Sequence, residues 1–420
     1  MSSPISATTP AQPLRPPRGP GGGPPTLLLV PTLPALRTED GQVVLTEKFV
    51  EGTQAFANFW PGRLEVLFRP SLERTDNLDN RAYSAGDLPF AISVADFHSD
   101  EALFRISRAN VVLGGLCHEQ THLSALAREL GVPFVYTSEY TLRTRLQIAR
   151  VEERNPARRY RRMLFEINLE RRQKRSLKLA SGIQCNGTPT YDVYHEWAPK
   201  PHLFFDTRVS ETELVEHEQL DRRVEQLTAG DPNRPARLAF SGRLKEMKGA
   251  DHLVPFADEL RALGVNFTLD VFGDGVLADS MKRDIQKRGL ERLVRMRGNL
   301  RFSEELLPEL RQNIDLFVAC HRQGDPSCTY LETFGCGVPI LGYDNEAFSG
   351  LLERAVAGVK SPMDDPKALA REAAELLADP SRIARMSRAA RRFAEANSCE
   401  RSFQRRTDHL LEVARELPAG

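Results

Sequence analysis

Short apolar runs, each followed by a polar stretch long enough for a helix, recur between Arg237 and Asn345. Runs of this length between helix-sized segments predict repeated strand–helix units and therefore a parallel sheet. The runs are LAFS (238–241), TLDVF (268–272), VRM (294–296), IDLFVAC (314–320) and VPILGY (338–343). The carboxyl ends of these strands are the expected ligand side of the sheet.

The first half of the chain has the same rhythm. A helix is expected over Lys48–Trp60 and another over Thr121–Leu130. The predicted strands are TLLLV (26–30), RLEVLF (63–68), LPFAISVA (88–95), NVVLGGL (110–116), PFVYTS (133–138) and GIQCN (182–186). The pattern predicts an α/β protein with two Rossmann-like domains, each built on a parallel sheet.

The expected boundaries follow from composition. Residues 1–25 are rich in Pro and Gly and predict a disordered tail. An amino-terminal domain over 26–200, a hinge over 201–235, a second domain over 236–385 and closing helices over 386–420 complete the expectation.

A chain of 420 residues is too long for a single core. A net charge of +0 gives no global attraction to nucleic acid. The 6 cysteines show no C-x-x-C spacing, which favours a reducing, cytoplasmic setting. We expect no transmembrane helix, no bound metal and no cofactor, since no apolar run is long enough to span a bilayer and no H-x-x-x-H or D-x-D motif is present.

Two cations follow the first strand of the second domain. Arg243 and Lys248 lie in GRLKEMKG, beside Gly242 and Gly249. Glycines allow a close backbone approach and the cations neutralise charge, so this loop is a candidate diphosphate site. The alternative is a pair of exposed loop cations.

A second candidate is PSCTYLE, read as a loop that becomes a helix. The N–H groups at a helix start near Ser327 and Cys328 could bind phosphate oxygens. Glu332 has two interpretations. It could accept the two hydroxyls of a ribose, or it could complete a capping box with Thr329.

One further motif and two single residues are weaker candidates for a binding or catalytic role. Gly273-x-Gly275 formally fits a dinucleotide fingerprint, although a simple glycine turn gives the same letters. In the first domain, His118 and Glu139 each follow a strand and are candidates for acceptor contact or proton transfer. Local hydrogen bonding explains either residue equally well.

Residues 154–179 form an arginine-dense segment in which Tyr160, Leu164 and Ile167 recur at helical spacing. The segment predicts either a solvated surface helix or a helix that contacts anionic lipid head groups or a phosphate-bearing acceptor.

The motifs GRLKEMKG and GDPSCTYLETFGCGVP together resemble the GT-B glycosyltransferases of the retaining family 4 type, called glycosyl transferases group 1. The resemblance is close over 238–345. It implies two domains facing across a cleft and a nucleotide-sugar donor held by the second domain. It also implies that Arg243 and Lys248 neutralise the diphosphate, that Glu332 binds the ribose, and that the base lies near Gly298.

The chain departs from this family at one glutamate of the E-x7-E motif, where Gly324 stands. Asp325, one residue later, is the candidate replacement for contact with the donor sugar. The resemblance implies a metal-independent transfer from a UDP- or GDP-sugar to a saccharide or glycolipid acceptor. The alternatives are a degenerate GT-B protein that binds without transfer, and a nucleotide-sugar 2-epimerase.

Overall fold

The computed structural model describes residues 23–73, 80–229, 231 and 233–415. Most of the predicted tail and part of the segment 230–235 lie outside the described residues. The chain divides into two compact units, one drawn from residues 1–115, 122–135 and 407–420, the other from 116–121 and 136–406. The domain boundaries expected from the sequence stay a prediction.

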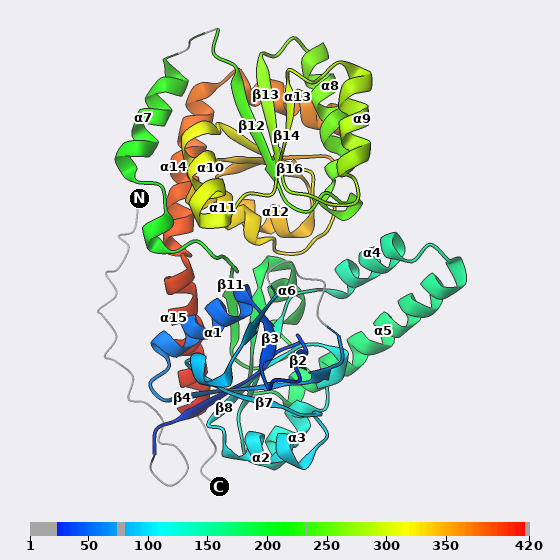
Figure 1. Cartoon of the computed structure of the whole chain (residues 1–420), viewed down its shortest axis with the longest axis vertical. Coiled ribbons are helices and arrows are strands. Elements are labelled where there is room, and N and C mark those ends of the chain that lie inside the picture. The colour runs from blue at the N-terminus through cyan, green and yellow to red at the C-terminus, as the bar shows by residue number, and fades with distance from the viewer. Residues whose placement is uncertain (1–22, 74–79, 230, 232, 416–420) are drawn as a thin grey trace, which may run out of the picture. The chain divides into compact units, whose positions relative to one another are not determined.

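Within the described residues, one sheet has seven strands in the order β11-β10-β9-β8-β1-β4-β7 (Figure 1). The pairs β1–β4, β1–β8, β4–β7 and β10–β11 are parallel. The strands are β1 (Thr26–Val30), β4 (Arg63–Phe68), β7 (Ala91–Val94), β8 (Val111–Gly115), β9 (Phe134–Ser138), β10 (Gly182–Asn186) and β11 (Pro201–Phe204). Most residues of β1, β8 and β10 are buried, as expected for strands inside a parallel sheet.

Strand β11 occupies the first four residues of the segment 201–235, where the sequence indicated a linker rather than a strand. The strand lies at an edge and pairs with β10. Its first residue, Pro201, lacks an N–H group, which an edge strand tolerates at that position. Only Phe204 of the strand is buried, so the apolar signal was too weak to predict it. The charged run that follows forms helix α7 (His217–Thr228).

A small mixed sheet in the first unit was also missed. Its order is β5-β2-β3-β6, with β2 (Ala35–Arg37), β3 (Val43–Thr46), β5 (Pro70–Ser71) and β6 (Asn80–Tyr83). Strands this short carry too few residues for a periodic pattern.

The second parallel sheet has the order β14-β13-β12-β15-β16-β17 within the described residues. Its strands are β12 (Ala236–Ser241), β13 (Phe267–Phe272), β14 (Val294–Gly298), β15 (Leu316–Ala319), β16 (Ile340–Tyr343) and β17 (Gly358–Ser361). Each recorded pairing is parallel. The sheet confirms the repeated strand–helix units predicted for this half.

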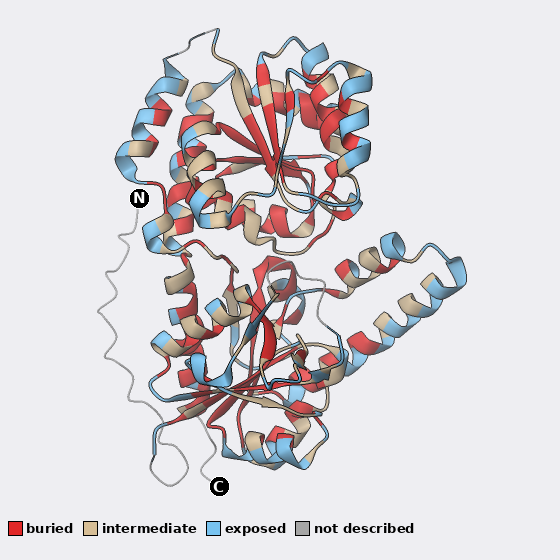
Figure 2. Cartoon of the chain, viewed as in Figure 1, coloured by how far each residue is buried: buried red, intermediate tan, exposed pale blue. Residues whose placement is uncertain are grey.

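Alternate residues of these strands point into two separate cores, as the period of a strand requires. Phe240 and Val318 pack into one core, whereas Ala239 and Phe317 pack into the other. Helices α8 (Leu253–Ala262), α9 (Ala278–Arg288) and α13 (Pro366–Leu377) contribute to the first core; α10 (Leu307–Asn313), α11 (Cys328–Gly335) and α12 (Glu346–Leu352) contribute to the second, and α14 (Pro380–Ala396) to both. Figure 2 shows the buried strands running through this sheet.

The remaining helices are α1 (Glu47–Phe59), α2 (Asp100–Arg108), α3 (Leu123–Glu129), α4 (Leu142–Glu152), α5 (Pro156–Leu179), α6 (Gly187–Tyr194) and α15 (Cys399–Arg415). Helix α5 confirms the helix predicted over the arginine-dense segment. It starts at Pro156 because the side chain of Asn155 accepts hydrogen bonds from two N–H groups of the first turn. None of the described helices has the length and apolar character needed to span a bilayer.

Candidate active site

Backbone hydrogen bonds join the loops at the carboxyl ends of β12, β13 and β14. The N–H of Gly242 donates to Phe272 O at 3.1 Å, and that of Gly273 donates to Gly298 O at 2.7 Å. Gly273 has φ +120°, and a Cβ there would lie 2.0 Å from Gly242 O. Only glycine permits this approach. The glycines predicted to bind nucleotide therefore also fix the strand ends, and their ligand roles stay predictions.

The structure brings Lys248 together with Asp325. Lys248 ends a 3-10 turn (Glu246–Lys248) after β12, and its Nζ lies 3.6 Å from Asp325 Oδ2. Both side chains are largely buried. Arg243, at the start of the same loop, is exposed.

Lys245, which the sequence reasoning passed over, is a third cation in this loop. Burial lowers its pKa, and the positive charges of Arg243 and Lys248 lower it further. Like charges so close together are costly in the absence of an anion. The sequence signal that could have identified Lys245 is the spacing of basic residues in GRLKEMKG.

His321 is a second residue that the sequence did not single out. It follows β15, is 1% exposed, and packs against Tyr330 with ring centroids 5.5 Å apart. Burial, and then the charge of Lys248, hold its pKa well below the ordinary value, so the imidazole is neutral. Neither ring nitrogen, nor Oδ1 of Asp325, has a hydrogen-bond partner among the described residues. Buried polar groups of this kind are uncommon in folded proteins and require an explanation, of which a bound ligand is one.

Helix α11 starts beside these groups. Ser327 is its N-cap and Cys328 its first residue. The first N–H groups of a helix have no partner within it and attract anions. Thr329 lies inside the first turn, so the structure rules out the capping box that the sequence allowed for Glu332. The ribose role of Glu332 stays a prediction.

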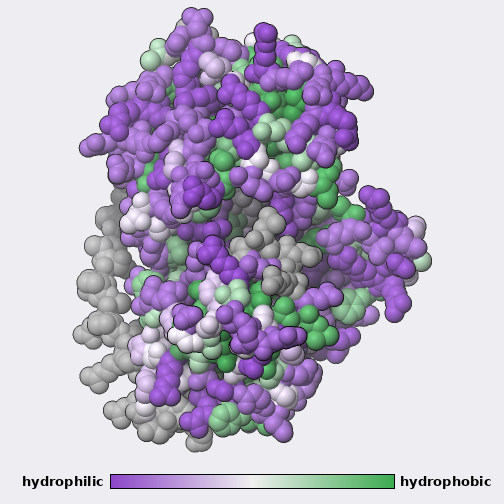
Figure 3. All heavy atoms as spheres, in the orientation of Figure 1, coloured by the Kyte–Doolittle hydropathy of each residue, from purple (hydrophilic) through white to green (hydrophobic). Residues whose placement is uncertain are grey.

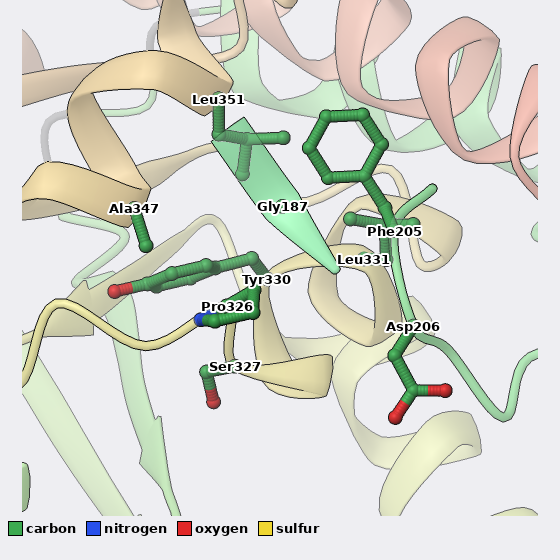
Figure 4. Close-up of a pocket in the computed structure, with 9 residues that line it drawn as sticks. All are labelled: Gly187, Phe205, Asp206, Pro326, Ser327, Tyr330, Leu331, Ala347 and Leu351. Atoms are coloured by element: carbon green, nitrogen blue, oxygen red, sulfur yellow. The ribbon is translucent and has the colours of Figure 1, made fainter. Parts of the chain in front are cut away.

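A narrow pocket of about 10 Å³ adjoins the start of α11 (Figure 4). It is far smaller than typical sites for whole ligands, about 300–1,000 Å³. Cys328 beside it donates from Sγ to Asp206 Oδ2 at 3.0 Å. The pocket is lined by Gly187, Phe205, Asp206, Pro326, Ser327, Tyr330, Leu331, Ala347 and Leu351.

The space beside Gly324, where the family motif would place a glutamate, is occupied. A Cβ at Gly324 would lie 3.2 Å from Glu346 Oε2 and 3.4 Å from Thr144 Oγ1. Glu346 also pairs with Arg143 at 2.6 Å. A larger carboxylate at position 324 would therefore crowd an existing one.

The acceptor-side candidates lie at the ends of neighbouring strands β8 and β9 of the other sheet. His118 lies in a 3-10 turn (His118–Gln120), half exposed, with its ring 6.0 Å from that of Phe165 on α5. Glu139 follows β9 and is exposed. Their roles stay predictions.

Two parallel sheets in two domains match the GT-B fold. HepE from Anabaena in complex with UDP shares this fold, with a TM-score of 0.63 over 92% of this chain and 99% of that chain, at 12% identity. Residues 223–393 match the family model for glycosyl transferases group 1. The matched residues contain the second sheet and its loops, and the family is the one that the motifs resemble.

The curated relatives of this chain are also glycosyltransferases. The chain is 30% identical over 203 residues to a GDP-mannose-dependent alpha-(1-6)-phosphatidylinositol monomannoside mannosyltransferase of Mycolicibacterium smegmatis, covering 46% of this chain and 52% of that protein. It is 29% identical over 196 residues to a D-inositol 3-phosphate glycosyltransferase of Salinispora tropica, covering 45% and 40%. The chain thus spans about half the length of these relatives. The family match over residues 223–393 and these relatives agree with the resemblance that the motifs show.

Proposed function

We propose that the chain is a retaining, metal-independent glycosyltransferase. It transfers a sugar from a UDP- or GDP-sugar to a saccharide or glycoconjugate acceptor. One relative is named for its dependence on GDP-mannose, and the structural neighbour holds UDP, which favours these donors.

The observation that carries the proposal is the cationic loop after β12 beside the start of α11. Departure of a nucleoside diphosphate leaves negative charge on the leaving group, and fixed donors lower the barrier by stabilising that charge. Arg243, Lys245 and Lys248 supply the charge, and the amides at Ser327 and Cys328 supply N–H donors. Lys248 touches Asp325 and would place it near the donor sugar.

The remaining contacts follow from position. Glu332, on α11, is the proposed partner of the ribose hydroxyls, and the loops at Gly273 and Gly298 are proposed to border the base. His118 and Glu139 are proposed to contact the acceptor from the other sheet.

The test is turnover of UDP- and GDP-sugars by the purified chain with a crude acceptor extract, in EDTA. Transfer with retained anomeric configuration, followed by NMR, is the expected result. Nucleotide binding without turnover would instead favour a degenerate GT-B protein. Conversion of the donor to its 2-epimer without acceptor would favour an epimerase, and a strict need for manganese would contradict metal independence.

We also propose that α5 makes peripheral contact with an anionic membrane surface. Its two acids, Glu166 and Glu170, are held by Arg145 of α4 at 2.9 Å and 2.8 Å. The exposed residues are therefore mostly cations and apolar side chains, and they include Arg158, Arg161, Arg171, Arg172, Arg175, Tyr160, Leu164 and Phe165. Figure 3 shows the mostly hydrophilic surface over α4 and α5. Such a mixture suits phospholipid head groups.

Cosedimentation with vesicles tests this contact. Vesicles with anionic lipid should retain the wild-type chain, neutral vesicles should not, and an Arg171→Glu/Arg175→Glu variant should lose retention. Arg283→Glu, an exposed arginine on α9, is the matched control. Equal retention of all three proteins on anionic vesicles would contradict the contact.

A further inference from the structure

Arg322 links the two loops that carry Lys248 and Asp325. Its backbone N–H donates to Met247 O at 3.1 Å, and its guanidinium donates to the carbonyl oxygen of Glu246. Both acceptors immediately precede Lys248 in the chain. Arg322 itself belongs to the loop of Asp325, which follows three residues later, so it joins this loop to the backbone just before Lys248.

The same guanidinium is held by acids from two further segments. It donates to Oδ1 and Oδ2 of Asp251, both at 2.8 Å, and it pairs with Asp364 after β17. Burial lowers the pKa of Arg322, but the hydrogen bonds and charges of Asp251 and Asp364 outweigh it and raise the pKa above the ordinary value. Arg322 is therefore a fixed cation.

A histidine completes this network. Nε2 of His252 lies 2.6 Å from a guanidinium nitrogen of Arg322, and Nδ1 lies 2.8 Å from Tyr343 Oη. Arginine can only donate, so Nε2 accepts and Nδ1 carries the proton. Burial, and then the charge of Arg322, lower the pKa of His252, which agrees with a neutral ring. The loops are thus also tied to the end of β16.

The turn after Lys248 packs directly on the loop that follows β15. Gly249 has φ +68°, and a Cβ there would lie 1.9 Å from Cys320 O. This close contact and the backbone hydrogen bond from Arg322 to Met247 both join the two loops. The Lys248–Asp325 separation of 3.6 Å exceeds a direct hydrogen bond, so that pair does not set the geometry by itself.

We propose that Arg322 is a positioning residue for the donor site, which fixes Lys248 beside Asp325 without touching the donor. This role rests on the proposed function. It explains why an arginine whose guanidinium has four different partners stands between the two loops, where a lysine could not reproduce the fork of contacts.

The test compares Arg322→Ala and Arg322→Lys by calorimetric binding of UDP and GDP. Affinity for the nucleotide that binds the wild-type chain should fall about tenfold in the alanine variant, roughly the loss of one charge-assisted contact, and less in the lysine variant. The lysine variant keeps a cation among the acids, so the binding measurement can be made on it if the alanine variant does not fold.

Arg234→Ala is the matched control. Arg234 forms the same two-pronged contact with an aspartate, Asp315, at 2.9 Å and 2.8 Å, but near the amino end of β12. It should lose thermal stability and keep nucleotide affinity. If Arg322→Ala behaves in the same way, Arg322 is only structural and the inference is overturned.

A double-mutant cycle with Lys248→Ala separates this inference from the proposed function. If Arg322 acts through Lys248, adding Arg322→Ala to Lys248→Ala should change affinity less than twofold. Additive losses would overturn the positioning role while leaving the donor site intact. Unchanged affinity in Lys248→Ala alone would contradict the donor site and the positioning role together.

Discussion

At the scale of residues, the proposed donor loop holds three cations close together, and a bound diphosphate would reduce the repulsion between them. Arg243, Lys245 and Lys248 lie within one short loop, and burial together with its two neighbours lowers the pKa of Lys245. An anion between these residues favours the charged lysine and raises that pKa again. Affinity and pH are therefore linked through Lys245.

The sign of this linkage is definite. Below the lowered pKa, Lys245 is charged in the free and the bound protein, and affinity is full. As pH rises through that pKa, binding must take up a proton and affinity falls, at a pH below the ordinary lysine range. Calorimetry with UDP or GDP at several pH values, in buffers of different ionisation heat, measures both effects.

Lys245→Arg supplies the decisive comparison, because arginine stays protonated throughout. The alkaline fall in affinity should move to higher pH in this variant. Lys287→Arg, an exposed lysine at the end of α9, controls for the substitution itself. Identical pH profiles for the wild-type chain and Lys245→Arg would rule out a role for Lys245.

At the scale of elements, the start of helix α11 removes one of the two interpretations of Glu332, the capping box. Because Ser327 is the N-cap, Thr329 occupies the second helical position and cannot form the capping box. Glu332 is partly exposed, one turn into the helix, where a carboxylate can face a ligand at the helix start.

Glu332→Gln should weaken nucleotide affinity about tenfold with little change in melting temperature, as expected for one lost charge-assisted contact. The loss should vanish with a 2′,3′-dideoxynucleotide, which lacks the hydroxyls. Thr329→Ala is the control for capping. It should lower the free energy of unfolding by far less than the ~1 kcal/mol that removal of an N-cap side chain costs. A lowered melting temperature with unchanged affinity in Glu332→Gln would contradict the ribose role.

The sequence predicted elements well where burial makes the pattern strong. Strands such as β8 and β12 are buried on both faces, and their apolar runs stand out. Edge strand β11 was missed because it is half exposed. Lys245 and His321 were missed for a different reason, since their significance comes from neighbours that folding brings together rather than from spacing. The prediction of where α11 starts depended on which of two residues caps the helix, Ser327 or Thr329.

At the scale of the whole molecule, we propose that one parallel sheet carries the donor-binding loops and the other carries the acceptor-binding loops. The loops after β12, β13 and β14 and the start of α11 form the proposed donor side. The ends of β8 and β9, with α5 near His118, form the proposed acceptor side. The family match covers residues 223–393, which include the proposed donor side but not the proposed acceptor side.

The most direct test of the central claim is thermal unfolding with UDP, GDP, ADP and their sugar conjugates. Ligand at 100 times its dissociation constant should add about 2.7 kcal/mol to the free energy of unfolding. We expect stabilisation by one nucleotide family, lost in Arg243→Ala and kept in Arg292→Ala, an exposed arginine just before β14. No stabilisation by any nucleotide, or equal stabilisation of all three proteins, would contradict a donor site at this loop.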